Sequence, residues 1–464
     1  MDAASWTPDD AERADLELLL SGAFSPLQGF LDRADTESVR ATGRLADGTE
    51  WPVPVVLQVP DELAGAPALT LTDPEGAPLA RLAITEAWPA GRGRQFVAGP
   101  VAALAEPAYG TFRSLHLTPA QVREQLGSGP VLATVAGTPL HCAGIAGLRA
   151  AAECLDARTL LLIPTGTSGD EPLVRAVLAA AAELPGAVPV AVALRSPDGS
   201  AAHALLGAHV AAAYGATHLL AAAGLPGAPL PVVPPTPAAQ PALSDEALNA
   251  LLDAGAPLPA GFTPAAVERE LRRTRRPLTR RGLVVLFTGL SGSGKSTLAR
   301  GLHDTLLERG DRTTTLLDGD VVRRMLSAGL GFSRADRDLN ITRIGYVAAE
   351  AARHGGVAIC APIAPYASTR AAVRAMAEAA GDFVLVWVST PLERCEARDR
   401  KGLYARARAG GLPGFTGIDD PYEEPLDADV VIDTSDRPIG DCVAEVVTFL
   451  RHGGWLSDQT AVTP

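Results

Sequence analysis

The residues of this chain that are best suited to chemistry lie in a glycine-rich stretch past its middle. Gly289 and Gly294 frame four residues, and Lys295 and Ser296 follow directly. In this order, glycines allow successive backbone N–H groups to turn toward a chain of phosphates, the lysine reaches the terminal phosphates, and the hydroxyl is left for Mg²⁺. The stretch therefore predicts a binding site for a nucleoside triphosphate. We expect it to be formed by Gly289, Ser291, Gly292, Ser293, Gly294, Lys295, Ser296 and Thr297.

Two carboxylates follow this stretch at the end of the next β-like run. The apolar run 283–287 before the glycines, and the helical pattern after them, are typical of a buried parallel strand and a helix. A second run, 313–317, leads into Asp318 and Asp320. Because the carboxyl ends of parallel strands meet at one edge of a sheet, both carboxylates are expected beside the phosphates. With Lys295 they are the expected catalytic residues: Asp318 on the metal side with Ser296, and Asp320 near an attacking hydroxyl, although sequence alone allows the reverse assignment.

The composition excludes several classes of function. The chain has 464 residues and a formal net charge of −13, whereas nucleic-acid binders usually carry a basic surface. Its five cysteines show no CxxC spacing, so neither a zinc site nor a disulfide framework is indicated. The first residues lack a basic region followed by an apolar one, and no apolar run reaches membrane-spanning length. We expect a cytoplasmic protein without a nucleic-acid or membrane partner.

The chain divides by pattern into three domains and a linker. Residues 1–115 contain short β-like runs, such as 53–57, and predict a mostly β module. Residues 116–273 alternate apolar runs with alanine-rich helical segments, which is typical of an α/β domain with a parallel sheet. Residues 282–454 alternate in the same way and form the expected phosphate-loop domain, after an arginine-rich linker at 274–281.

Six arginines lie between positions 272 and 281. Such a cluster can bind an anionic ligand or nucleic acid, or it can be a solvated linker that contacts acidic surface of the same protein. The acidic balance of the whole chain favours the linker.

Six segments of the C-terminal domain, taken in order, resemble adenylylsulfate kinase. They are 289–296, 317–320, 330–333, 336–340, 401–404 and 414–419. The resemblance covers essentially all of 282–454 and implies a P-loop kinase domain with a parallel sheet. This family transfers the γ-phosphoryl group of ATP to the 3′-hydroxyl of adenosine 5′-phosphosulfate, so the resemblance implies ATP and Mg²⁺ as cofactors and this nucleotide as the small-molecule substrate.

The resemblance also implies which residues hold the acceptor. They are Asp320, Arg323, Phe332, Arg337, Asn340, Ile363, Ala364, Lys401, Gly414 and Phe415. Phe332 and Phe415 would sandwich the adenine, since a flat base is bound by aromatic faces. The two arginines and Asn340 would hold the phosphosulfate and ribose, and Lys401 lies on a mobile lid in the family.

One position departs from the family pattern in a way that affects the mechanism. Some members have a serine here that becomes phosphorylated, whereas this chain has Ala364. Without a hydroxyl no phosphoserine can form at this position. We therefore expect direct in-line transfer from ATP to the acceptor.

The N-terminal half resembles ATP sulfurylase, which makes the substrate of the kinase. Residues 18–30 and 44–55 are similar to its N-terminal, PUA-like module. The expected catalytic motif, however, is matched by 135–144, which keeps His141 but lacks the glutamine, the arginine and the second histidine. Two other stretches, 222–225 and 243–248, have lost basic residues. Because such groups bind sulfate and phosphates, we expect a sulfurylase-like scaffold without sulfurylase activity.

The leading hypothesis is thus an adenylylsulfate kinase, expected to be a homo-oligomer, behind a degenerate sulfurylase-like half. A working bifunctional enzyme is the first alternative. In another, the N-terminal half is a module for binding or oligomerisation that senses a nucleotide or docks a separate ATP sulfurylase. A kinase for a different small hydroxylated acceptor is disfavoured by the joint spacing of Phe332, Arg337, Asn340 and Phe415.

Overall fold

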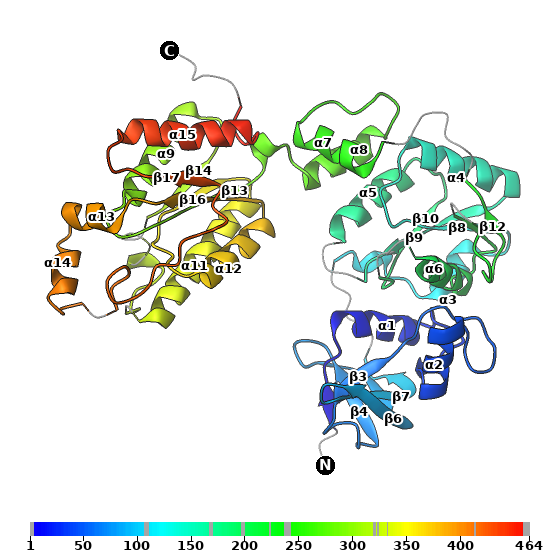
Figure 1. Cartoon of the computed structure of the whole chain (residues 1–464). Helices are drawn as coiled ribbons and strands as arrows, with labels where there is room; N and C mark the ends of the chain where they lie inside the picture. Colours follow the sequence, from blue (N-terminus) through cyan, green and yellow to red (C-terminus); the bar gives the residue numbers. More distant parts are fainter. Residues whose placement is uncertain are drawn as a thin grey trace. The chain divides into compact units, whose positions relative to one another are not determined.

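A computed structural model of the chain forms two compact units (Figure 1). The first comprises Met1–Asp245 and Leu258–Thr274, and the second comprises Glu246–Pro257 and Arg275–Pro464. The residues that the structure describes are 4–105, 111–166, 170–195, 200–221, 224–235, 243–318, 322, 324–331, 333–412 and 414–457. In these ranges no helix combines the length and the apolar character needed to cross a bilayer.

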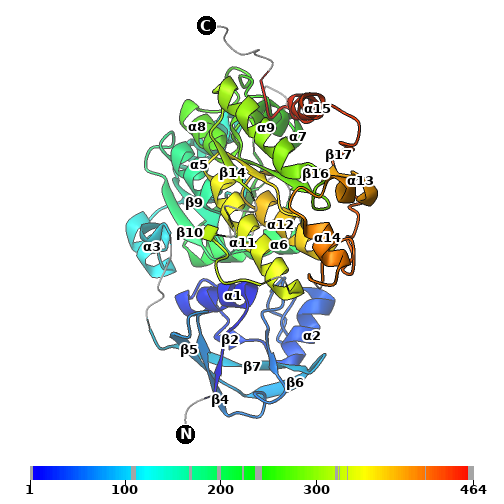
Figure 2. The same ribbon diagram turned by 90° about the vertical axis from the view of Figure 1, so that its left-hand side faces the viewer.

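The first unit begins with a mostly antiparallel sheet built around one long strand, β7 (Arg94–Ala103). Its other strands are β1 (Ser5–Trp6), β2 (Gly29–Phe30), β3 (Leu57–Pro60), β4 (Ala68–Thr72), β5 (Pro78–Ala83) and β6 (Glu86–Gly91). Strands β2, β3, β5 and β6 all pair with β7, and two helices, α1 (Asp10–Ser21) and α2 (Arg33–Thr42), lie along one side of the sheet (Figure 2). The run 53–57, expected as a strand, joins the sheet only at Leu57, because Pro54 cannot donate a ladder hydrogen bond.

The same unit continues into a five-stranded, fully parallel sheet in the order β10-β9-β8-β11-β12. Its strands are β8 (Val131–Val135), β9 (Arg158–Pro164), β10 (Val188–Val192), β11 (His218–Leu220) and β12 (Val232–Val233). Its helices are α3 (Pro119–Leu126), α4 (Cys142–Leu155), α5 (Glu171–Ala181), α6 (Ala201–Ala213) and α8 (Ala265–Thr274). One hydrophobic cluster includes both Trp51 of the β module and Leu162 of this sheet. The two parts therefore share a core.

The second unit is a five-stranded parallel sheet in the order β14-β15-β13-β16-β17. The strands are β13 (Leu283–Thr288), β14 (Thr314–Leu317), β15 (Val357–Cys360), β16 (Asp382–Val388) and β17 (Val430–Ile432). Helices α9 (Lys295–Arg309) and α15 (Ile439–His452) cover one face, and α11 (Arg334–Arg353) and α12 (Ala367–Glu378) cover the other (Figure 1). Because both faces are covered, every residue of the central strand β13 is buried. Two short helices, α13 (Leu392–Arg398) and α14 (Leu403–Arg408), follow β16.

The arginine-rich stretch is anchored to acidic residues of its own unit. Arg275 makes a bidentate contact with Asp253, the last residue of α7 (Asp245–Asp253), with N–O distances of 2.7 and 2.6 Å. Arg281 also donates to Asp253, and it lies 3.5 Å from Asp382. These ion pairs favour the linker interpretation over an open anion-binding patch, since their guanidinium groups already have carboxylate partners.

Candidate active site

The glycine-rich stretch forms a tight loop between the central strand β13 and helix α9. Only glycine fits at its first position: a side chain on Gly289 would lie 2.5 Å from the carbonyl oxygen of Val388. At the end of the loop Gly294 has φ +104°, a conformation that L side chains rarely adopt, and it caps the start of α9. Backbone N–H groups and the positive end of a fifteen-residue helix therefore converge where phosphates are expected.

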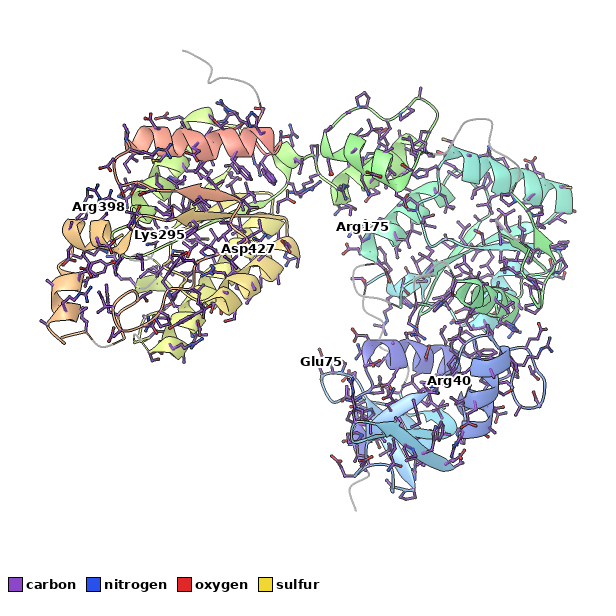
Figure 3. The ribbon with its side chains drawn as sticks, in the orientation of Figure 1. Arg40, Glu75, Arg175, Lys295, Arg398 and Asp427 are labelled. Carbon is purple, nitrogen blue, oxygen red and sulfur yellow. The ribbon has the colours of Figure 1, made fainter. Side chains whose placement is uncertain are left out.

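Lys295 is buried at the start of α9, at the same end of the sheet as Arg398 (Figure 3). Only 6% of Lys295 is exposed, and its Nζ donates a 2.6 Å hydrogen bond to the carbonyl oxygen of Leu290. Burial lowers the pKa of this ammonium group from 10.5 to about 8, because desolvation disfavours its charged form. The lysine therefore lies beneath the loop, and its ammonium group loses its proton at a lower pH than that of an exposed lysine.

Two oxygen-bearing side chains of the kind that can bind a metal lie side by side at the carboxyl edge. Ser296 Oγ donates a 2.9 Å hydrogen bond to Asp318 Oδ1, and Arg300 lies 3.2 Å from the other carboxylate oxygen. A hydroxyl and a carboxylate fit Mg²⁺, which takes few protein ligands and keeps several of its waters. No cluster of three or more His, Cys, Asp or Glu side chains that could hold a metal lies within the described residues.

On the side of the edge where the acceptor residues are predicted, a carboxylate, Asp420, joins several side chains. Arg337 on α11 donates 2.8 Å hydrogen bonds to Asp420 Oδ2, to Thr416 Oγ1 and to the carbonyl oxygen of Gly414. The hydroxyl of Tyr366 donates to the same carboxylate at 2.9 Å. Arg337 therefore holds the loop 414–420 in place through three hydrogen bonds, a role that the sequence did not indicate.

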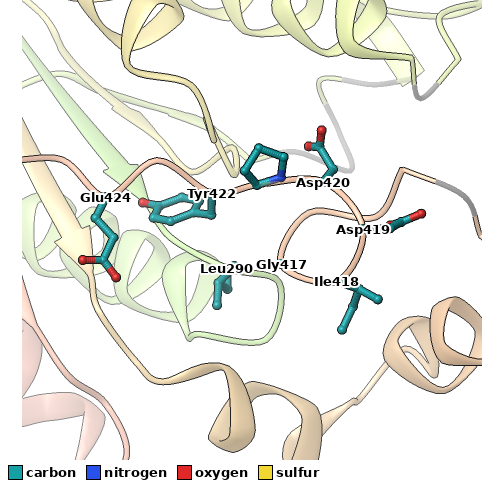
Figure 4. Close-up of a pocket in the computed structure, with 8 residues that line it drawn as sticks. Leu290, Gly417, Ile418, Asp419, Asp420, Tyr422 and Glu424 are labelled. Carbon is teal, nitrogen blue, oxygen red and sulfur yellow. The ribbon is translucent and has the colours of Figure 1, made fainter.

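An open cleft of about 490 Å³ lies between this loop and the phosphate loop. Figure 4 shows Leu290, from the phosphate loop, beside the segment that carries Gly417 and Tyr422. The hydroxyl of Tyr422 lies 2.9 Å from Thr288 Oγ1, at the end of β13. Segments more than a hundred residues apart thus form one wall of the cleft.

Among the predicted acceptor residues, Ile363, Arg337 and Gly414 are joined to this edge by hydrogen bonds. Ile363 accepts hydrogen bonds from Thr288 Oγ1 and from the N–H of Gly289, so its backbone is joined to the phosphate loop. Ala364 is fully buried and has φ +46°, a left-handed conformation that is rare for alanine. Asn340 is also buried, and its Oδ1 has no hydrogen-bond partner among the described residues. Lys401 is exposed on the segment before α14.

Three predicted residues, Asp320, Arg323 and Phe332, lie outside the described residues. Their roles remain predictions. Four residues that touch the site were not predicted: Tyr366, Arg398, Tyr404 and Asp420. Tyr404 lies within one of the segments that resemble adenylylsulfate kinase, and Asp420 directly follows another. This location was the one indication in the sequence that these two residues belong to the site.

Comparisons with known proteins agree with this geometry. Residues 281–433 match the family model for adenylylsulphate kinase, and residues 3–98 match that for a PUA-like domain. A solved structure, "Hexameric APS kinase from Thiobacillus denitrificans", is 34% identical, with a TM-score of 0.84 over 98% of this chain and 94% of that one. The chain belongs to the adenylylsulphate kinase family. It is an ATP-dependent phosphotransferase, and the predicted fold of a parallel-sheet kinase domain behind a strand-rich N-terminal module and an α/β domain is confirmed.

Curated relatives named sulfate adenylyltransferase also match nearly the whole chain. The protein of Mycosarcoma maydis is 31% identical over 95% of this chain and 93% of its own length, and that of Yarrowia lipolytica is 32% identical over 98% and 95%. The first alignment has 536 positions against 464 residues here, so at least 72 positions of that relative have no counterpart in this adenylylsulphate kinase family member.

Proposed function

We propose that the protein transfers the γ-phosphoryl group of ATP directly to the 3′-hydroxyl of adenosine 5′-phosphosulfate, and that its N-terminal half makes none of this substrate. The proposal of phosphoryl transfer rests on three parts of the structure that lie together at one edge of the sheet. These are the phosphate loop with buried Lys295, the Ser296–Asp318 pair, and the loop 414–420 held by Arg337. Phosphoryl transfer needs mainly positioning and neutralisation of charge, which such a constellation supplies.

On the donor side, the loop N–H groups and Lys295 would bind the β- and γ-phosphates. Ser296 and Asp318 would hold Mg²⁺, which when bound neutralises charge on the transferred group. Asp320 would accept the proton of the attacking hydroxyl, as a carboxylate near the acceptor can. Ala364 offers no oxygen for a phosphoenzyme, which supports a single displacement.

On the acceptor side, Phe415 would stack on the adenine, together with Phe332. The buried carbonyl oxygen of Asn340 would accept a hydrogen bond from the ribose, which would give this orphan atom a partner. Arg337 and Arg323 would face the phosphosulfate, with Arg337 already fixed by its three contacts to the loop 414–420. Ile363, Gly414 and Lys401 would complete the site.

The N-terminal half is proposed to be catalytically silent because the arginines of its parallel-sheet part already have partners within the protein. Residues 131–245 contain four arginines and no lysine. Arg149 and Arg158 donate to backbone carbonyls, Arg175 pairs with Glu171, and Arg195 lies 3.7 Å from buried Asp15. Binding sulfate and a triphosphate requires several available cations. The arrangement supports a role of this half in folding or assembly.

The proposal extends to assembly and location. A homo-oligomer is supported by the similar kinase of Thiobacillus denitrificans, which is described as hexameric. A reducing cytoplasm is supported by the five cysteines, all of which are free thiols.

The test is an assay of ADP release by the full-length protein with ATP and adenosine 5′-phosphosulfate, beside an assay of pyrophosphate release with ATP and sulfate. We expect turnover in the first and none in the second. Lys295→Ala should abolish the first reaction, and it serves as the control for the second. Pyrophosphate release that persists in Lys295→Ala would refute the silent N-terminal half, and absence of turnover in the first assay would refute the acceptor.

A further inference from the structure

The carbonyl oxygens of the phosphate loop are held by side chains from four separate segments. Tyr404 Oη donates a 2.8 Å hydrogen bond to the carbonyl oxygen of Ser291. The carbonyl oxygen of Ser293 accepts hydrogen bonds from Thr434 Oγ1 at 2.8 Å and from Thr390 Oγ1 at 3.2 Å. Arg398 donates at 2.8 Å to the same Thr434 hydroxyl.

These contacts decide where the loop N–H groups point. In a planar trans peptide the C=O and the following N–H point in opposite directions. A donor that fixes the carbonyl group of Ser291 therefore turns the N–H of Gly292 to the other side. A donor to the carbonyl group of Ser293 turns the N–H of Gly294 in the same way. In the proposed function these N–H groups bind the phosphates, so the donors to the loop carbonyls preset the geometry of the site.

Tyr404 differs from the other donors because it also touches the acceptor side. Its ring packs edge to face on Phe415, with ring centroids 5.1 Å apart and planes at 80°. The side chain is 3% exposed, and burial raises the pKa of its hydroxyl above the ordinary value, so the hydroxyl stays a donor at any working pH. Asp399 fixes its backbone by accepting hydrogen bonds from the N–H groups of Tyr404 and Ala405.

We propose that Tyr404 is a positioning residue for both substrates: its hydroxyl sets the phosphate loop that binds ATP, and its ring sets Phe415, which stacks on the acceptor base. The role of Phe415 rests on the proposed function, whereas the contact with the phosphate loop does not. The two contacts come from different parts of one side chain, so the hydroxyl contact can be removed while the ring contact is kept.

The experiment compares Tyr404→Phe with Tyr404→Leu in the full-length enzyme. Tyr404→Phe keeps the ring and removes the hydroxyl, leaving the Ser291 carbonyl without its donor, and we expect KM for ATP to rise about tenfold. KM for adenosine 5′-phosphosulfate should stay within about twofold, since the ring contact remains. Tyr404→Leu removes both contacts, and both KM values should rise. Tyr346→Phe, at an exposed tyrosine on α11, is the matched control and should change neither.

Equal changes of both KM values in Tyr404→Phe, or no change in either, would overturn the proposal. Calorimetry of ATP binding without acceptor separates this result from the proposed function. If the wild-type enzyme fails to phosphorylate adenosine 5′-phosphosulfate, the proposed function fails. A tenfold weaker binding of ATP to Tyr404→Phe would still support the link to the phosphate loop, and unchanged binding would refute it.

Discussion

The protonation of Lys295 gives a quantitative test of the phosphate site. In the ligand-free protein, burial lowers the pKa of this ammonium group to about 8. Bound phosphates bring negative charge next to it, and nearby opposite charge favours the protonated form. If the phosphates restore the pKa to the ordinary 10.5, ATP binding must take up a proton wherever the free lysine is neutral.

The magnitude follows from the two pKa values. At pH 9 a group with a pKa of about 8 is roughly 10% protonated, whereas one with a pKa near 10.5 is about 97% protonated, so binding should take up about 0.9 proton. At pH 7 the free lysine is already about 90% protonated, and uptake falls to about 0.1 proton. Because only the protonated form binds well, affinity for ATP should fall about tenfold between pH 7 and pH 9, which is about 1.4 kcal/mol.

The measurement is isothermal titration of Mg·ATP into the protein without acceptor, at pH 7, 8 and 9, in buffers with different ionisation enthalpies. The slope of the observed enthalpy against buffer enthalpy gives the number of protons taken up. Lys295→Arg is the control, since a guanidinium does not titrate in this range and uptake at pH 9 should vanish. Uptake below about 0.2 proton at pH 9 in the wild type, or the same uptake in Lys295→Arg, would refute the assignment of Lys295 to the phosphates.

Three further perturbations test other parts of the molecule. Asp318→Asn should raise the Mg²⁺ concentration for half-maximal activity about tenfold, seen by Mg²⁺ titration, whereas Asp304→Asn, on the same helix as Ser296 and exposed, should not. Phe415→Ala should raise KM for the acceptor about tenfold and leave KM for ATP within about twofold in steady-state kinetics. Burial raises the pKa of Asp15 to about 7, so between pH 6 and pH 8 the folded state binds a proton that the unfolded state does not. The first unit should therefore be about 1 kcal/mol more stable at pH 6 than at pH 8. Thermal unfolding should show this pH dependence in the wild type and a flatter one in Asp15→Asn.

The phosphate site could be predicted from the sequence because its parts are local. Strand β13 ends at Thr288, one residue beyond the expected run, and α9 begins at Lys295 inside the motif. Each glycine, the lysine and the serine lie within eight positions, so their backbone conformation is set by neighbours in the chain. The Ser296–Asp318 contact also follows from sequence, since all strands of a parallel sheet end at the same edge, including β13 and β14, which lie on either side of β15.

The supports of the site could not be predicted, because they join segments that are distant in the sequence. Tyr366 and Asp420 are 54 positions apart, and Arg337 and Asp420 are 83 apart. Nothing in the pattern around Asp420 distinguishes a carboxylate that holds an arginine from one that faces solvent. The hydroxyls behind the phosphate loop pose the same problem: Thr390 and Thr434 follow two different strands and meet only when the sheet is assembled.

The two parallel sheets of this chain show why the fold alone does not decide the activity. Both have five strands and a carboxyl edge on which ligands of such folds bind. In the kinase unit that edge carries Lys295, whose burial disfavours its charged form, and the negative charge of a bound ligand would favour that form again. In the other sheet Arg195 lies 3.7 Å from the buried carboxyl group of Asp15, a partner within the same unit. Under the proposal that the N-terminal half is catalytically silent, such pairing within the fold takes the place of ligand binding, while the shared core around Trp51 keeps the fold together.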